Sequence, residues 1–308
     1  MKEKRILVTG GAGFIGSHVA DALIDLGHQV IVIDDLSTGL KANVSKAAEL
    51  VVADIRSEKA ASLVIRFKPQ IIFHLAAQMD VRKSVSDPSF DADVNIRGTL
   101  NLLEAGRKNG LEKVVFSSTG GAVYGEQRIY PADETHSEWP LSPYGITKLA
   151  VEKYLYYYYD AFGLNVVCLR YANVYGPRQN AHGEAGVIAI FCGKLLLGQK
   201  PTIFGDGENT RDFVFVGDVV RANLATLEKD GYHIYNVGTG IESTVNQVYT
   251  YLIRIIGSGL DPIYGEARLG EQRRSCISSS KIKEELGVEI ITPLREGLEK
   301  TVDWFKSK

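Results

Sequence analysis

The chain has 308 residues, of which 45% are hydrophobic and 23% are charged, an ordinary composition for a globular protein. Its 35 lysines and arginines face 37 aspartates and glutamates, so the formal net charge of -2 argues against a nucleic-acid-binding protein, which would usually be basic. No apolar stretch approaches the length of a membrane span, and the apolar run within residues 1–8 is too short for a targeting segment.

Three cysteines, Cys168, Cys192 and Cys276, form no C-x-x-C pair, and their number is odd. We therefore expect buried, reduced cysteines in a cytoplasmic protein, with neither a disulfide framework nor a metal site.

The first half of the chain alternates short apolar runs with helical patterns. A helix is expected over residues 17–26, and Gly27 ends it. Strands are expected over residues 5–9, 29–33, 49–53, 70–75, 113–117 and 165–169. This alternation predicts an α/β fold with a doubly wound, parallel sheet of the Rossmann type.

After about Arg170, loops rich in glycine and proline become frequent, and residues 235–240 resemble a strand followed by a turn. We expect a first domain over residues 1–170. A smaller α/β domain should cover mainly residues 171–308, with some segments returning to the first. Residues 154–159 contain five tyrosines on a helical pattern, which indicates core packing together with a contact surface between subunits.

A glycine-rich segment lies between the first expected strand and the first expected helix. Gly10, Gly13 and Gly16 allow the backbone to turn tightly and to approach a pyrophosphate at the helix N-terminus. Asp34 ends the second strand at the spacing expected for a carboxylate that accepts the ribose hydroxyls of NAD and repels the 2′-phosphate of NADP. Asp35 is a weaker candidate. The alternatives are a structural turn for the glycines and a helix N-cap for Asp34.

Two further strand ends are candidates for cofactor contact. Asp54 and Ile55 follow the third strand, where the adenine would lie, and Ala76, Ala77 and Gln78 follow the fourth. Either segment can also be read as a tight strand exit.

The sequence from Tyr144 to Lys148 has the pattern Y-x-x-x-K. On a helix these two side chains share a face, so the ammonium of Lys148 is expected to lower the pKa of the Tyr144 phenol. Thr119 ends the fifth strand, and its hydroxyl can bind a substrate oxygen as that oxygen loses its proton. The alternatives are an exposed helix face and a strand-end cap.

With these motifs the chain resembles the extended short-chain dehydrogenase/reductase family, most closely its UDP-glucose 4-epimerase branch. The matching stretches cover residues 9–16, 74–78, 95, 98–105, 117–125, 144–148, 169–178, 204–207 and 210–213. The resemblance implies NAD held by a Rossmann domain and a nucleotide-sugar held by the smaller domain. It extends the expected NAD contacts to Phe14, Ile15, Ser37, Thr38, Gly39, Leu75, Asn95, Ser117, Tyr144, Lys148 and Tyr171.

The resemblance also implies a mechanism. Tyr144 would take the proton of the sugar 4-hydroxyl, Thr119 would assist by hydrogen bonding, and hydride would pass from C4 to NAD and return to the other face. Ser118 is the alternative to Thr119, because Gly120 and Gly121 add one residue to the commoner family pattern.

On the substrate side, the resemblance implies that Arg211 and Arg268 hold the diphosphate. Guanidinium groups suit bidentate phosphate binding. The further expected UDP-sugar contacts are Asn173, Glu271 at the uridine ribose, and Val187, Thr202 and Phe204 around the uracil. The alternative for each arginine is a surface ion pair, and the alternative for Asn173 is a turn residue. For Val187, Thr202 and Phe204 the alternative is the core of a loop. Glu271 stands where the family commonly has an aspartate.

Two positions separate reactions within the family. Gly121 and Ala122 replace the acidic pair of the 4,6-dehydratases, and Ala122 replaces the glutamate of the decarboxylating relatives. Small Ser275 at the expected gate beside the sugar 2-substituent suggests that N-acetylated sugars enter.

The expected activity is therefore interconversion of UDP-glucose and UDP-galactose, with UDP-GlcNAc and UDP-GalNAc as further substrates. The alternatives are UDP-glucuronate 4-epimerisation and, in a different class, an NAD-binding sensor or scaffold without turnover. By the same resemblance, helices over residues 95–107 and 144–159 pair in a homodimer. The alternative is a monomer with those faces folded inward.

Overall fold

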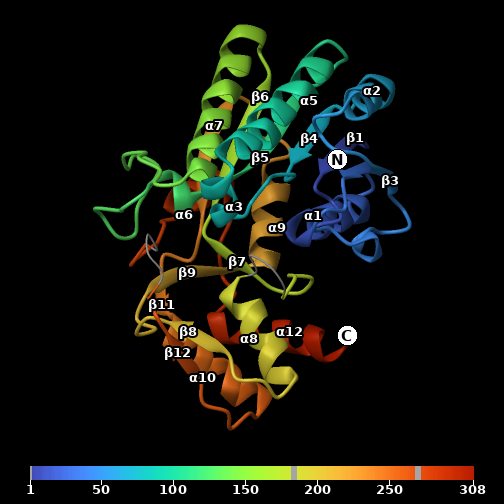
Figure 1. The fold of residues 1–308 in the computed structure, drawn as a ribbon. Helices are drawn as coiled ribbons and strands as arrows, with labels where there is room; N and C mark the ends of the chain where they lie inside the picture. Colours follow the sequence, from blue (N-terminus) through green and yellow to red (C-terminus); the bar gives the residue numbers. More distant parts are fainter. Residues whose placement is uncertain (1, 182–185, 268–271) are drawn as a thin grey trace. The chain divides into compact units, whose positions relative to one another are not determined.

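The computed structural model describes residues 2–181, 186–267 and 272–308. Its largest sheet has seven strands in the order β10-β6-β5-β4-β1-β2-β3 (Figure 1). The bounds are β1 Arg5–Thr9, β2 Gln29–Asp34, β3 Glu49–Val52, β4 Ile71–His74, β5 Lys113–Thr119, β6 Asn165–Tyr171 and β10 Tyr232–Val237. The pairs β1–β2, β1–β4, β2–β3 and β4–β5 are parallel, which confirms the predicted Rossmann-type sheet. The strand order reverses between β1 and β4, and ligands bind at such a point in folds of this class.

Helices cover the sheet because its central strands are apolar on both faces. One hydrophobic cluster joins Leu7 and Ile72 of the sheet to Leu63, Leu102 and Leu155 of the helices α2 Glu58–Phe67, α5 Gly98–Arg107 and α7 Pro143–Phe162. Ile6 and Val8 alternate with Leu7 and point to the other face, where α1 Phe14–Asp25 contacts β1 and β2.

Shorter elements connect these layers. They are a 3₁₀ turn Lys41–Asn43, α3 Val81–Ser86, α4 Pro88–Ala92, a π-helix Asp93–Arg97, α6 Gly120–Val123 and α9 Val216–Ala225. The long helix α7 has clear end signals. Ser142 accepts a hydrogen bond from the backbone N–H of Gly145 at 3.2 Å, Pro143 takes the first turn, and Gly163 ends the helix in the left-handed conformation.

Two predicted elements begin three residues earlier in the structure. Helix α1 begins at Phe14 rather than residue 17, because Gly13 is the N-cap and the last part of the glycine motif is already helical. The strand expected over residues 235–240 is β10 Tyr232–Val237, and it belongs to the large sheet.

All three cysteines are buried and unpaired, as predicted.

The remaining strands form two small sheets. Strand β9 Thr210–Phe215 pairs in parallel with β7 Asn173–Tyr175 and antiparallel with β11 Glu242–Thr244, and β8 Thr202–Phe204 pairs with β12 Ile263–Gly265. The accompanying helices are α8 Val187–Leu196, α10 Val245–Ile256, α11 Ser280–Leu286 and α12 Leu294–Lys306. A second hydrophobic cluster, with Phe191, Phe213, Leu252 and Leu298 among its members, joins these elements.

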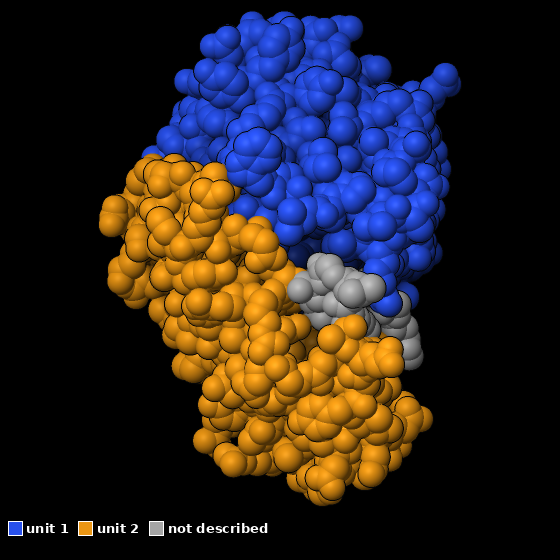
Figure 2. Space-filling model, turned by 60° about the vertical axis from the view of Figure 1, so that its left-hand side comes forward, with its two compact units in different colours: residues 1–125, 138–170, 220–235 blue, residues 126–137, 171–219, 236–308 orange. Residues whose placement is uncertain are grey.

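The chain divides into two compact units, which Figure 2 shows in different colours. The first unit comprises residues 1–125, 138–170 and 220–235, and the second comprises residues 126–137, 171–219 and 236–308. One boundary falls between Arg170 and Tyr171. Assigning NAD to the first unit and the nucleotide-sugar to the second remains a prediction.

Candidate active site

The glycine-rich segment joins β1 to α1 in a form that excludes side chains. Gly10 has a φ of +68°, and a Cβ there would lie 2.7 Å from the backbone nitrogen of Ala76. A Cβ on Gly16 would lie 2.2 Å from the carbonyl oxygen of Gly10. Gly13 caps the twelve-residue helix α1 without any side-chain hydrogen bond to its first turn. Uncapped N–H groups and a close-packed glycine backbone fit a pyrophosphate, and binding of the pyrophosphate here stays a prediction.

Asp34 at the end of β2 has a structural task besides its predicted one. Its carboxylate accepts hydrogen bonds from the N–H groups of Ala12 at 3.0 Å and Leu36 at 2.8 Å, and it therefore ties the glycine loop to the strand end. Burial raises the pKa of Asp34, while these two backbone bonds oppose the rise. Each carboxylate oxygen keeps a further lone pair, so ribose hydroxyls can still donate to it.

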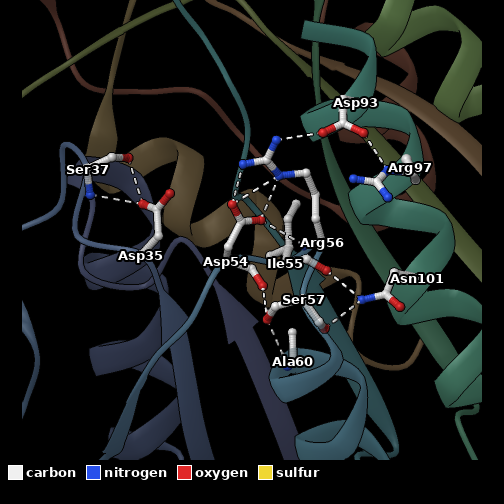
Figure 3. Close-up of polar contacts among 10 residues, drawn as sticks. All are labelled: Asp35, Ser37, Asp54, Ile55, Arg56, Ser57, Ala60, Asp93, Arg97 and Asn101. Atoms are coloured by element: carbon white, nitrogen blue, oxygen red, sulfur yellow. Dashed lines mark hydrogen bonds and ion pairs between the residues drawn. The ribbon is translucent and has the colours of Figure 1, made fainter. Parts of the chain in front are cut away.

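The next residues form an exposed turn. Asp35 accepts hydrogen bonds from the backbone N–H of Ser37 at 2.9 Å and from its hydroxyl at 2.6 Å (Figure 3). Thr38 is exposed, whereas Gly39 is buried against Asp34, whose Oδ1 would lie 2.8 Å from an added Cβ. The turn thus closes over the strand end that carries Asp34.

An ion-pair cluster surrounds the end of β3, and no sequence pattern indicates it. The Nε of Arg56 lies 3.0 Å from both carboxylate oxygens of Asp54, and a terminal nitrogen donates to Asp93 at 2.6 Å (Figure 3). Hydrogen bonds from Arg56 lower the pKa of Asp54. Ile55 is buried, and its carbonyl accepts from Asn101. Arg56 therefore joins Asp54 and Ile55 as a residue of the expected adenine region.

The exit from β4 is fixed against the end of β1. The backbone N–H groups of Leu75 and Ala76 donate to the hydroxyl of Thr9 at 3.2 and 3.1 Å. His74 lies between the hydroxyls of Thr9 and Thr99, at 2.7 and 2.8 Å, and burial lowers its pKa to about 3. A neutral His74 thus holds the strand exit close to Gly10.

A second buried network lies beyond that exit and includes two predicted cofactor residues, Gln78 and Asn95. The Asn95 carboxamide accepts from the backbone N–H of Gln78 at 2.8 Å and donates to its carbonyl at 3.0 Å. Both side chains also donate to Asp91, which is fully buried on α4 and accepts a further bond from Thr147 at 2.7 Å. The structure therefore gives Asn95 a positioning task, and its contact with NAD stays a prediction.

The Y-x-x-x-K residues lie at the start of α7, beside the end of β5. The ammonium of Lys148 donates to the carbonyl oxygen of Ser117 at 2.8 Å and lies 5.9 Å from the centre of the Tyr144 ring. Lys148 is buried, so this charge sits out of water. The predicted sharing of one helix face by Tyr144 and Lys148 is confirmed.

The expected lowering of the Tyr144 pKa is wrong for this structure. Burial, and then the negative charge of Asp91, raise the pKa of Tyr144 above its ordinary value. Burial also lowers the pKa of Lys148 to about 8, although Asp91 and Glu152 act in the opposite direction. The physical reason is that Lys148 bonds to a backbone carbonyl, while desolvation disfavours the phenolate.

The two hydroxyl candidates of β5 differ in their surroundings. Ser118 is buried and donates to a carboxylate oxygen of Glu152 at 2.5 Å. Thr119 is half-buried at the last position of the strand, and it makes no side-chain capping bond to α6. The alternative interpretation of Thr119 as a strand-end cap therefore loses support. The Ser118 hydroxyl is already engaged in a hydrogen bond with a buried carboxylate.

The predicted substrate residues of the second unit occupy several elements. Asn173 begins β7 and is exposed, while Arg211 on β9 donates to the carbonyl of Thr210 at 2.8 Å. Val187 begins α8, and Thr202 and Phe204 bound β8. Ser275 is buried, Tyr171 is buried at the end of β6, and Arg268 and Glu271 lie outside the described residues.

Asp212 follows Arg211, and no sequence pattern predicts a role for it. It is almost fully buried, and its carboxylate accepts from the N–H groups of Thr239 at 2.8 Å and Gly240 at 3.1 Å. These bonds tie β9 to the turn after β10, and so fix the backbone that carries Arg211.

Within residues 2–181, 186–267 and 272–308, no group of three or more His, Cys, Asp or Glu side chains is arranged to hold a metal ion. In the same part of the chain, no helix is both long and apolar enough to span a membrane.

Comparison with known proteins identifies the family. Residues 6–238 match the model of the NAD dependent epimerase/dehydratase family. The UDP-glucose 4-epimerase of Mycolicibacterium smegmatis is 46% identical over 310 residues, covering 99% of both chains. The chain therefore belongs to the NAD dependent epimerase/dehydratase family, and it is an enzyme that uses NAD.

Two solved structures share the fold over nearly their whole length. The UDP-glucose 4-epimerase of Thermotoga maritima, solved with UDP-glucose, is 48% identical with a TM-score of 0.96, covering 98% of this chain and 99% of that one. The UDP-glucose 4-epimerase of Thermus thermophilus, solved with NAD, is 43% identical with a TM-score of 0.92, again covering 98% and 99%.

Proposed function

We propose that the protein is a UDP-hexose 4-epimerase that interconverts UDP-glucose and UDP-galactose. The observation that carries the proposal is the arrangement of half-buried Tyr144 and buried Lys148 on one helix face. There Lys148 is bonded to the end of the strand that carries Thr119. The names of the relatives at 46% and 48% identity support the same activity.

The cofactor contacts follow from the first unit. The uncapped N-terminus of α1 and the glycine backbone would hold the pyrophosphate of NAD, and Asp34 would accept the ribose hydroxyls. Bound NAD supplies an acceptor for the C4 hydride of the sugar and a donor for its return.

The chain's own residues would manage the proton. Tyr144 removes the proton of the 4-hydroxyl as a general base and gives it back in the second half of the reaction. Since burial raises the pKa of Tyr144, positive charge near the phenol must stabilise the phenolate, and Lys148 is the cation on the same helix face. Thr119 holds the 4-oxygen by a hydrogen bond, and small Gly121 and Ala122 leave no acid to expel a 6-hydroxyl.

The nucleotide contacts would come from the second unit. Arg211 is proposed to bind the diphosphate together with Arg268, and Asn173 is proposed to contact a phosphate. The backbone that carries Arg211 is fixed by the hydrogen bonds that the buried Asp212 carboxylate accepts from Thr239 and Gly240. Glu271 would contact the uridine ribose, and Val187, Thr202 and Phe204 would surround the uracil.

The choice of sugar is tested by proton NMR of UDP-glucose, UDP-N-acetylglucosamine and UDP-glucuronate, each incubated separately with the protein and NAD. We expect a new anomeric signal with UDP-glucose. A signal with the N-acetyl sugar that disappears in Ser275→Tyr would support the gate proposed at Ser275. A signal with the glucuronate alone would favour that alternative, and no signal in any tube would overturn the proposal.

We also propose a homodimer through α7. Ile146, Ala150, Tyr154 and Tyr157 follow one another at helical spacing, and Ile146, Tyr154 and Tyr157 are 53%, 42% and 54% exposed. Such an apolar stripe is typical of a contact surface. Sedimentation of wild type and Tyr154→Glu tests this, since a dimer should become a monomer. The matched control is Tyr156→Glu, because Tyr156 lies on another side of the helix against Tyr232.

A further inference from the structure

A fully buried ion pair lies behind the candidate catalytic residues, within the first unit. Glu152 on α7 and Arg170 on β6 both have side chains with 0% exposure. The guanidinium of Arg170 donates to the two carboxylate oxygens of Glu152 at 3.0 and 2.5 Å, and to the hydroxyl of Tyr124 at 3.1 Å. A second carboxylate, that of Glu138, also accepts from Arg170.

This ion pair is joined to the end of β5 by the hydroxyl of Ser118, which donates to Glu152. One residue earlier, the carbonyl of Ser117 accepts from Lys148. Lys148 and Glu152 are four residues apart on α7 and therefore lie on one face. Two consecutive residues of the strand are thus tied to two consecutive turns of the helix.

A buried ion pair is weak evidence for stability, because apolar side chains of the same volume often support a fold equally well. Its charged and forked hydrogen bonds instead fix the relative positions of the elements that they join. Three elements meet here, namely the end of β5, the middle of α7 and the end of β6.

We propose that Glu152, held by Arg170, is a positioning residue that fixes the end of β5 against α7 so that Thr119, Tyr144 and Lys148 act together. The inference rests on the proposed epimerase function for its kinetic readout, and on the Lys148 titration for a readout without turnover. Glu152 acts through Ser118 and Lys148 and is not itself proposed to touch the sugar or NAD.

Charge gives Glu152 a second effect on the same site. The ionisable groups that act on Lys148 are Asp91 from α4, Glu152 and Tyr144 from α7, and His74 from β4, which is neutral. Burial lowers the pKa of Lys148 to about 8, and the negative charge of Glu152 opposes that shift. Removal of this charge should therefore lower the pKa of Lys148 further, whereas a purely structural support would leave it unchanged.

The test uses Glu152→Gln and the double variant Glu152→Gln/Arg170→Met, both in the full chain with NAD. Glutamine keeps an acceptor for Ser118, and methionine removes the buried cation that glutamine would leave without its carboxylate. The matched control is Glu104→Gln on α5, because Glu104 also joins an arginine, Arg107, to a hydroxyl of α7, that of Tyr158. Thermal unfolding shows which variants fold.

We expect kcat to fall about 10- to 100-fold in the double variant with KM for UDP-glucose changed less than threefold, because misplaced catalytic groups lower the rate and not binding. The ¹³Cε signal of Lys148, assigned with Lys148→Met, should titrate at lower pH in Glu152→Gln, which removes the negative charge and keeps Arg170. Glu104→Gln should change neither readout. A folded double variant with wild-type kcat, together with an unmoved Lys148 titration in Glu152→Gln, would overturn the inference.

The two proposals fail in different ways. If the wild-type protein converts no UDP-sugar, the epimerase proposal fails, and the Lys148 titration alone decides the inference. A lowered titration midpoint in Glu152→Gln would then support coupling of Glu152 to Lys148, and an unchanged midpoint would refute it.

Discussion

Thr147 donates a hydrogen bond of 2.7 Å to Asp91, a carboxylate that is fully buried next to the helix face carrying Tyr144 and Lys148. Burial, and then the charge of Asp91, raise the pKa of Tyr144, whereas for Lys148 the larger effect of burial lowers the pKa and the charge of Asp91 opposes it. Asp91 therefore favours a protonated phenol and a charged ammonium in the same site.

Asp91→Asn is expected to move the acid limb of the pH dependence of kcat to lower pH. Loss of the negative charge lowers the pKa of both residues, and Lys148 sets the acid limb because its pKa lies below that of Tyr144. A shift of about one pH unit corresponds to about 1.4 kcal/mol. Initial rates between pH 5 and pH 10 measure this limb. A limb at its wild-type position in a folded variant would contradict this role for Asp91.

Tyr144→Phe is expected to lower kcat about 10²- to 10⁴-fold, the range typical for loss of a general base. The change removes only a hydroxyl, so NAD should bind as in the wild type. Coupled assay of UDP-galactose formation measures the rate, and cofactor content after gel filtration measures binding. Retention of more than a tenth of the wild-type rate would exclude Tyr144 as the base.

Thr119→Val should reduce kcat about tenfold while leaving the melting temperature within a few degrees, because the half-buried hydroxyl makes no capping bond to α6. Thr119→Ser should restore most of the rate. Ser118→Ala should lower the stability by about 1–3 kcal/mol, since it leaves the buried Glu152 with one donor fewer, and should lower the rate only as far as the end of β5 moves. Rates and thermal unfolding of the three variants, measured together, decide between the two hydroxyls. If Ser118→Ala lost the rate and Thr119→Val kept it, the assignment would be reversed.

Gly16→Ala is expected to abolish NAD binding, because the added Cβ would lie 2.2 Å from the carbonyl oxygen of Gly10. Gly259→Ala is the matched control, since a Cβ there meets no atom within 4 Å and needs no positive φ. Calorimetric titration with NAD compares the two variants. Wild-type affinity in Gly16→Ala would show that the loop does not form the cofactor site.

Local pattern was sufficient for the glycine motif, the Y-x-x-x-K pair and the positions of the strands along the chain, because each depends on spacing along one element or on its buried faces. Asp91, Glu152 and Arg170 could not be found this way. They are charged residues within a helix or strand, and only tertiary contacts with Thr147, Ser118 and Tyr124 bury them.

The predicted lowering of the Tyr144 pKa was wrong for the same reason. Helical spacing correctly placed Lys148 on its face, but spacing carries no information on desolvation or on Asp91 from another helix. The Ser117 carbonyl that accepts from Lys148 was equally hidden, since a backbone acceptor leaves no signature in residue type.

The proposed reaction is epimerisation by transient oxidation at C4, with the proton handled by Tyr144. The most direct test is NMR of UDP-glucose that carries deuterium at C4, incubated with the protein and NAD in ordinary water. We expect a new anomeric signal of UDP-galactose in which C4 still carries the deuterium. A product with solvent hydrogen at C4, or no new signal at all, would contradict it.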